Sequence, residues 1–189
     1  MLNSPHRFGT VARAFHWTVF LLFAAQYVGG ILMSRVARND TVLGWTQGTW
    51  YEWHKSIGLV VLLLTVARLS WRLATPMPDW SPVLEEGERR MSAWLERLLY
   101  LALLVAPLSG FVFVMAGGYG IKLFDGPPLP NPIGKVAWLE GPAHAVHLVS
   151  VWLAMILAAW HVGHVLKKHF VDQLPLLSRM LPFGSGDRR

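Results

Sequence analysis

The chain of 189 residues contains no cysteine, and this absence excludes several kinds of cofactor site. Without thiols there is no disulfide, no zinc–thiolate centre, no iron–sulfur cluster held by thiolates and no thioether-linked haem. Charged residues are also scarce, at 15% of the chain, against about 25% in a typical soluble domain. Basic residues never run longer than two in a row, so nucleic-acid binding is a poor interpretation.

Hydrophobic residues make up 53% of the chain and include ten tryptophans, which points to lipid as the solvent. Four apolar stretches reach the length of about 20 residues that a membrane-spanning helix needs. We expect helices over about 14–33, 54–74, 98–119 and 143–166. The first stretch is too long for the apolar core of a signal peptide and lacks a clear cleavage site. The sequence therefore predicts an all-α membrane protein, a four-transmembrane-helix bundle forming one domain over residues 1–189.

The lysines and arginines predict the orientation of this bundle, because they concentrate on the cytoplasmic side of membrane proteins. If both termini are cytoplasmic, twelve fall on the inner side and five on the outer side. The inner ones are Arg7, Arg13, Arg68, Arg72, Arg89, Arg90, Arg97, Lys167, Lys168, Arg179, Arg188 and Arg189; the outer ones are Arg35, Arg38, Lys55, Lys122 and Lys135. We expect a multi-pass protein of a bacterial inner membrane with both termini in the cytoplasm.

Two connections carry recognisable signals. The first outer loop contains Trp45, Trp50 and Trp53, which fit an interfacial aromatic belt. In the inner loop, Ser81 is a candidate N-cap of a short helix, with Pro82 at its first position and Glu85 and Glu86 in its first turn. In the third stretch, Pro107 is expected to kink the helix.

Histidines inside the predicted helices are the candidate functional residues, because an ionisable side chain in a span is costly and usually functional. For any single histidine, an ordinary interhelical hydrogen bond is the alternative. His147 and His161 are 14 positions apart, which returns to within about 40° of the same helix face at a separation of about 21 Å. His144 departs from the face of His161 by about 100°, and His164 departs from the face of His147 by about 100°, so they are weaker candidates.

Depth in the membrane pairs the histidines across helices. His16 and His161 both lie toward the inner surface, and His54 and His147 both lie toward the outer surface. Each pair predicts one iron held from both sides, giving two haem b groups with bis-histidine ligation. Such ligation leaves no open iron position, so it favours electron transfer over oxygen binding.

Haem propionates need cationic or hydrogen-bonding partners in this setting. Arg68 is 14 positions after His54 and so lies at the level of the inner haem, while Lys55 and Ser56 lie beside the outer haem. We expect all three as propionate partners; for Lys55 the alternative is snorkelling to the interface. Gly58, Gly110 and Gly163 would let a flat macrocycle approach the backbone, or would only permit tight helix packing.

Four segments together resemble the prokaryotic cytochrome b561 family, and the resemblance covers nearly the whole chain. They are ARAFHW, WHKSIGLVVLLLTVARLSWRL, LLYLALLVAPLSG and HLVSVWLAMILAAWHVGHVLKKHFVDQLPLLSRMLP. The resemblance implies a four-helix dihaem protein of the inner membrane whose haem ligands fall on His16, His54, His147 and His161. Family members often carry a histidine just before the third-helix motif, where this chain has Glu96 and Arg97.

The resemblance also implies an electron carrier between a reductant and ubiquinone, and one type of member takes electrons from superoxide at the outer face. We expect electron transfer between a donor at the outer face and the ubiquinone pool, in a membrane oxidoreductase or carrier of the respiratory chain whose catalytic residues are not assigned. One alternative is a cytochrome b membrane anchor of a larger respiratory dehydrogenase or hydrogenase, with a soluble partner protein. Another is a haem-free metal or proton transporter with histidines as relays.

Overall fold

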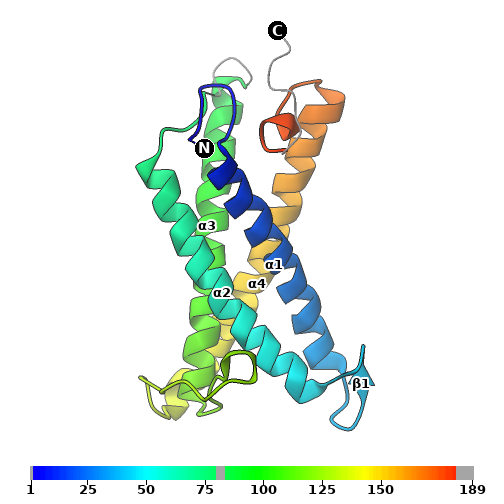
Figure 1. The fold of residues 1–189 in the computed structure, drawn as a ribbon, viewed down its shortest axis with the longest axis vertical. Helices are drawn as coiled ribbons and strands as arrows, with labels where there is room; N and C mark the ends of the chain where they lie inside the picture. The colour runs from blue at the N-terminus through cyan, green and yellow to red at the C-terminus, as the bar shows by residue number, and fades with distance from the viewer. Residues whose placement is uncertain (1, 80–83, 182–189) are drawn as a thin grey trace.

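The computed structural model describes residues 2–79 and 84–181. Four long helices dominate this part of the chain: α1 (Thr10–Arg35), α2 (Gln47–Ala74), α3 (Glu86–Ala116) and α4 (Ala137–Leu166). Each is long and apolar enough to cross a membrane. In Figure 1, α1 and α2 run across the front of α3 and α4. The most extensive packing is between α3 and α4, followed by that between α1 and α2. The expected four-helix membrane bundle is confirmed.

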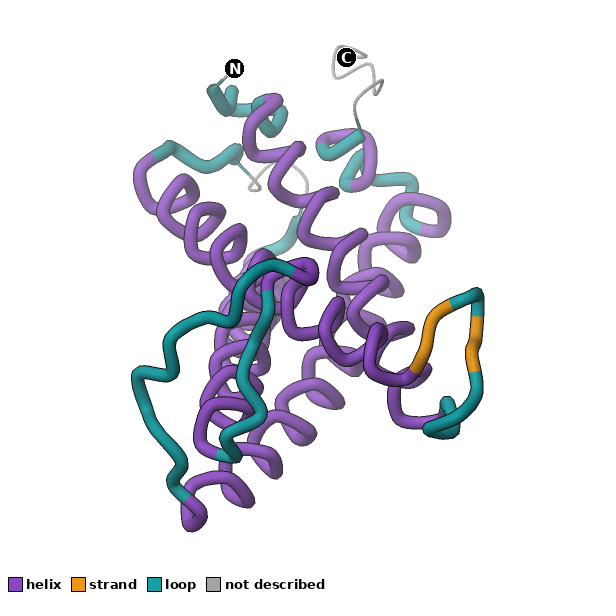
Figure 2. Tube along the Cα trace, turned by 60° about the horizontal axis from the view of Figure 1, so that its bottom comes forward, coloured by secondary structure: helices purple, strands orange, loops and turns teal. Residues whose placement is uncertain are grey.

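The bundle has two distinct ends (Figure 1). The terminal end carries the start of α1, the connection between α2 and α3, and the C-terminal residues after α4. The loop end carries the two other connections. At the loop end, strands β1 (Thr41–Val42) and β2 (Trp45–Thr46) form a short hairpin, drawn orange in Figure 2. Trp45 packs its ring 4.8 Å from that of Trp50 and 5.0 Å from that of Trp53, so the three tryptophans form one cluster.

The exterior of the bundle is apolar, while its interior contains small and polar side chains. Leu63 and Val149 are each 69% exposed, whereas Ser56 and Thr65 are completely buried. A soluble protein would show the opposite pattern, because water would drive the large apolar side chains inward. In lipid, helices pack through small residues, and Ala102, Ala106 and Ala154 are buried in this way between α3 and α4.

All four helices begin earlier than the hydropathy of the sequence indicated, α2 and α3 by the largest margins. α2 starts at Gln47, where the Thr46 side chain accepts a hydrogen bond from the Thr49 amide, so His54 lies two turns inside the helix. α3 starts at Glu86, not near residue 98, because its first three turns carry charges and lie outside the apolar stretch. Its N-cap is Glu85, which forms a reciprocal capping box with Glu88.

The short helix expected after Ser81 is therefore not separate: its first turn, with Glu86, is the first turn of α3. Ser81 and Pro82 lie outside the described residues. α3 continues through Pro107 to Ala116 without interruption.

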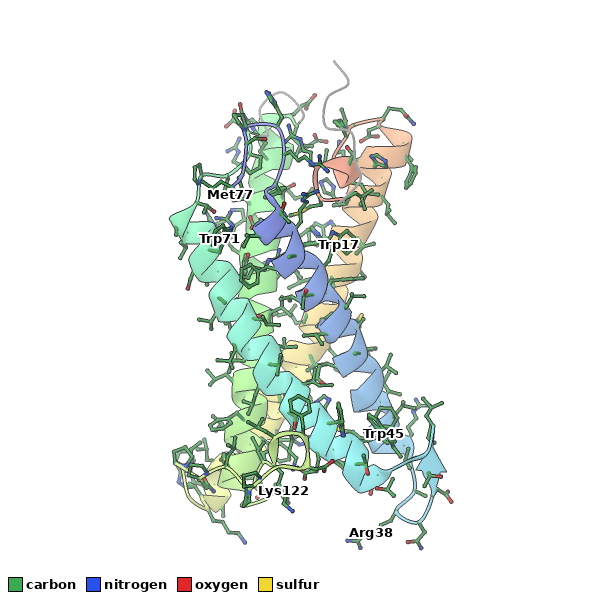
Figure 3. All side chains as sticks on the ribbon, in the orientation of Figure 1. Trp17, Arg38, Trp45, Trp71, Met77 and Lys122 are labelled. Carbon is green, nitrogen blue, oxygen red and sulfur yellow. The ribbon has the colours of Figure 1, made fainter. Side chains whose placement is uncertain are left out.

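The terminal end is closed by the C-terminal segment, which contains a π-helical turn, η2 (Lys167–Val171), and a 3-10 turn, η3 (Leu177–Arg179). The guanidinium groups of Arg7 and Arg13 both donate to the Leu181 carbonyl at 2.9 Å. The Trp17 indole donates to the Met180 carbonyl at 3.0 Å, and Figure 3 shows Trp17 on α1 near this end. These bonds tie the two ends of the described chain together.

Candidate functional site

Two pairs of histidines face each other between helices, at different depths of the bundle. His16 of α1 lies opposite His161 of α4, with 6.2 Å between the ring centres. His54 of α2 lies opposite His147 of α4, also with 6.2 Å between the ring centres. The structure thus brings together the four histidines singled out in the sequence, in the pairings expected from their depth.

The separation within each pair matches two ligands on opposite sides of one metal ion. A bond from a metal to an imidazole nitrogen is about 2 Å long, and the ring centre lies about 1 Å behind that nitrogen, so two opposed rings have centres roughly 6 Å apart. Among residues 2–79 and 84–181, no group of three or more metal-ligating side chains occurs that would hold a bare ion. Two histidines on opposite sides of one ion supply two ligands, which suits a metal that brings its other ligands with it, as haem iron does.

A cavity of about 450 Å³ lies around His16 and His161, which is within the usual size range of cofactor pockets. Its walls are mainly apolar, with Phe20, Phe23 and Leu99 among them. Polar side chains line it from the segments nearest the terminal end: Arg68, Arg72, Arg89, Ser92, Glu96 and His164. An apolar pocket with cations along one end fits a flat macrocycle that carries two carboxylates.

Arg68 is at the expected level, beside the pair at the terminal end. Its Nη2 lies 3.0 Å from Nδ1 of His16, and its guanidinium lies 5.2 Å from the centre of the Tyr100 ring. The neighbouring Arg72 forms a two-pronged ion pair with Glu96, at 2.5 and 2.7 Å. Glu96, which departs from the family pattern in sequence, thus neutralises one of the two arginines and leaves Arg68 as the cation next to the histidine pair.

The carbonyl of Ala106 on α3 orients His147. It lies 2.7 Å from Nδ1 of the imidazole, so Nδ1 carries the proton and donates it to the carbonyl. This leaves Nε2 with its lone pair, the form that binds a metal. Gly110 makes the approach possible, because a Cβ at this position would lie 2.9 Å from Nδ1 and 3.0 Å from Cε1. The sequence contains no signal for this contact beyond the glycine itself.

His54 has a different environment from its partner. Within the described part of the chain, its buried Nδ1 has no hydrogen-bond partner. Leaving a buried polar atom unsatisfied costs about 1–3 kcal/mol, so the ring fits a role in which one of its nitrogens binds another group. On α1, Gly30 lies against this ring, with an ideal Cβ only 3.5 Å from Cε1.

Lys55 and Ser56, expected as propionate partners, form their hydrogen bonds with α2 and with the loop between α3 and α4. Lys55 Nζ lies 2.5 Å from Glu52 Oε1 and donates to the Gly120 carbonyl at 3.0 Å. The Ser56 hydroxyl lies 3.0 Å from the Lys122 carbonyl and accepts a hydrogen bond from the Phe124 amide at 3.0 Å. Both side chains thus hold the loop between α3 and α4 against α2. Their closeness to His54 in the sequence did not predict the direction in which they point.

The remaining candidates from the sequence do not belong to either pair of facing histidines. Gly58 accommodates the Gln26 side chain, whose amide donates to the His54 carbonyl at 2.8 Å, so this glycine serves helix packing. Gly163 has no atom within 4 Å of an ideal Cβ. His164 Nε2 lies 3.4 Å from the Ser92 hydroxyl, and the exposed ring of His144 stacks on Phe113.

A four-helix membrane bundle with facing histidines in its interior is typical of the b-type membrane cytochromes. The chain belongs to the prokaryotic cytochrome b561 family, whose model matches residues 7–183. It is 30% identical to cytochrome b561 homolog 2 of Escherichia coli over 98% of this chain and 96% of that protein. It is 27% identical to cytochrome b562 of Cereibacter sphaeroides, over 88% of this chain and 89% of that one.

Membership of this family establishes the general role of the chain. It is a multi-pass protein of the bacterial inner membrane and a haem-binding b-type cytochrome of electron transport. A third relative, cytochrome b561 homolog 1 of Escherichia coli, is 23% identical over 94% of this chain and 98% of its own length.

The space that Gly110 leaves for the His147 ring gives a first prediction. Replacing Gly110 by Ala places a methyl group against the His147 ring, which must move off the Ala106 carbonyl; overpacking of this kind costs about 1–3 kcal/mol. We expect a lower haem-to-protein ratio in the purified variant, measured from the alkaline pyridine spectrum. Gly141→Ala is the matched control, because nothing lies within 4 Å of its Cβ position. Unchanged haem content and midpoint potentials in Gly110→Ala would contradict the role of Gly110 in making room for the His147 ring.

Proposed function

We propose that the chain binds two b-type haems and carries electrons between a donor at the loop end and the quinone pool. One haem is held between His16 and His161, and the other between His54 and His147. The observation that carries this proposal is the equal separation of 6.2 Å in the two facing pairs. A haem with two histidine ligands has no free iron position and supplies one-electron chemistry.

The protein's own groups determine how each site holds its haem. The Ala106 carbonyl keeps His147 in one tautomer and one orientation. At the terminal end, Arg68 supplies positive charge beside His16 for a propionate, and the walls of the cavity exclude water. Along α4, His147 and His161 are about 21 Å apart, so the two sites together reach across most of the roughly 30 Å of the hydrocarbon core.

Removal of single histidines tests the pairing. His161→Ala deletes a ligand of the pair at the terminal end and leaves His54 and His147 intact, so we expect the haem-to-protein ratio to fall to about half, since only one site keeps both ligands. His147→Ala should give the same ratio with a different residual spectrum. His6→Ala is the control, because His6 is exposed and belongs to neither pair. Retention of the full haem content in His161→Ala would refute the pairing.

Charge at the terminal-end site gives a prediction for the redox potential. Arg68→Leu removes a cation next to His16, and a nearby cation favours the reduced haem. We expect the midpoint potential of one haem to fall by roughly 100 mV, the effect of a unit charge about 7 Å away at an effective dielectric constant of about 20. Redox titration of the optical spectrum measures this shift. Arg68→Lys keeps the charge and should restore most of the potential; equal potentials in all three proteins would exclude the assignment.

The orientation of the bundle is part of the proposal: the terminal end faces the cytoplasm. The excess of lysine and arginine near this end supports it. Alkaline phosphatase, which is active only outside the cytoplasm, should be active when inserted in the loop at residues 126–134 and inactive when fused to the C-terminus. The reverse pattern would invert the proposed direction of electron entry. Haem content of both fusions checks that the bundle has assembled.

Superoxide is the donor that the family resemblance suggests, and it is an anion. The loop end carries five cations, Arg35, Arg38, Lys55, Lys122 and Lys135, against four acids, Asp40, Glu52, Asp125 and Glu140. Lys55 is also paired with Glu52. The net field that would steer an anion is therefore small. A superoxide reaction rate that does not change with salt would show that steering plays no part, without affecting the haem sites.

A further inference from the structure

His144 is an ionisable side chain that neither histidine pair uses. It lies on α4 about 10 Å along the helix from Ala137, and it is exposed on the outside of the bundle. The next residues along the same ridge, Leu148 and Trp152, are 47% and 59% exposed and face lipid. Ionisable residues within spans almost always face the bundle interior, so a histidine on this surface calls for a function.

Three further side chains join His144 in one patch at the loop end. The His144 ring stacks on Phe113 of α3, with 4.5 Å between the centres and 29° between the planes. The Phe113 ring is 5.7 Å from that of Tyr119. The Tyr119 hydroxyl donates to Glu140 Oε1 at 2.7 Å. We call Phe113, Tyr119, Glu140 and His144 the loop-end patch.

The backbone around the patch is shaped to keep Tyr119 in place. An ideal Cβ on Gly117 would lie 2.3 Å from Cε2 of the Tyr119 ring, so only glycine allows the ring to fold back over the end of α3. The Glu140 carboxylate raises the pKa of Tyr119, which keeps its hydroxyl protonated. The patch is therefore a fixed arrangement of a flat aromatic surface, an imidazole, a hydroxyl and a carboxylate.

The patch is adjacent to the proposed haem site at the loop end. His144 and His147 are three residues apart on α4, which separates them by about 4.5 Å along the helix and about 60° around it. His147 points between the helices toward His54, while His144 points outward to lipid. A redox molecule in the lipid could thus exchange electrons across one helix face without entering the bundle.

We propose that the loop-end patch binds the head group of a quinone, an inference that rests on the proposed exchange of electrons with the quinone pool. The His144 imidazole donates a hydrogen bond to one quinone carbonyl, and the quinone ring packs against the edges of the stacked His144 and Phe113 rings. The exposed apolar side chains of Leu148, Val149 and Trp152 provide a track for the isoprenoid tail.

Reduction of the quinone to a quinol at the loop-end patch requires two electrons, which one-electron donors supply in two steps. The quinone accepts two electrons, one at a time, and two protons from the aqueous phase at the loop end by way of Glu140 and Tyr119. Both carbonyl oxygens become hydroxyls, and the product is the quinol. With superoxide as donor, two superoxide anions lose one electron each and become two molecules of oxygen.

Reoxidation of the haems by quinone tests the patch. The full-length holoprotein in lipid nanodiscs is reduced chemically without oxygen and mixed with ubiquinone-1 in a stopped-flow instrument. His144→Phe keeps an aromatic ring against Phe113 and removes the ring nitrogens. We expect its second-order rate constant for haem reoxidation to fall about tenfold, the loss of roughly one hydrogen bond, with unchanged haem content and spectrum.

Two further variants make the test specific. Tyr119→Phe removes the hydroxyl bonded to Glu140 without changing α4, and should also slow reoxidation. Trp138→Phe is the control: it likewise replaces an N–H-bearing ring by phenyl on an exposed residue at the same end of α4, outside the patch. It should react like the wild type.

The outcomes separate the two levels of the proposal. If His144→Phe and Tyr119→Phe are reoxidised as fast as the wild type, the patch is not the quinone site. If His144→Phe loses haem, Tyr119→Phe decides, and a wild-type rate there also overturns the inference. If ubiquinone-1 does not reoxidise the wild type, the proposed exchange with quinone fails, whatever the variants do.

Discussion

The separation between two imidazole rings sets how tightly the four helices pack. In each pair the rings are 6.2 Å apart and come from different helices, so the backbones must keep a fixed distance at two depths. α4 contributes to both pairs, and α1 and α2 contribute to one each. α3 has no member of either pair, yet it packs most extensively against α4 and supplies the Ala106 carbonyl that orients His147. The buried alanines between α3 and α4 permit this close contact.

The two pairs have opposite electrostatic surroundings. At the terminal end, Arg68 lies against His16, and Glu96 neutralises only the next arginine. At the loop end, His147 donates to a backbone carbonyl, which gives the ring a partial negative charge and stabilises an oxidised metal. If each pair holds a haem as proposed, these surroundings give the haem at the terminal end the higher midpoint potential and leave the haem beside the loop-end patch as the stronger reductant. One side-chain cation and one backbone dipole thus distinguish two pairs of chemically identical residues.

The number of helices, the pairs of histidines and the place of Arg68 follow from the sequence, because helix geometry is regular and a span has few polar residues. The 14-residue intervals from His54 to Arg68 and from His147 to His161 were enough to place the two residues of each interval on nearly the same face of a helix at two depths. The start of α3 did not follow, since a helix that leaves the membrane becomes polar without ending. Lys55 and Ser56 form hydrogen bonds with a loop about 65 residues later in the chain, and the sequence did not indicate where this loop would fold. The hydrogen-bond acceptor of His147 is the backbone carbonyl of Ala106. Every residue has such a carbonyl, so the sequence does not indicate which one is used.

The position of α4 has a consequence for the assembly of the protein. Both facing pairs require a histidine from α4, which follows the other three long helices in the chain. The terminal end closes only when Met180 and Leu181 meet the side chains of Trp17, Arg7 and Arg13. A chain emerging from the ribosome with three helices in the membrane holds His16 and His54 without counterparts. If each pair holds a haem as proposed, neither haem gains both of its histidine ligands until α4 is in the membrane.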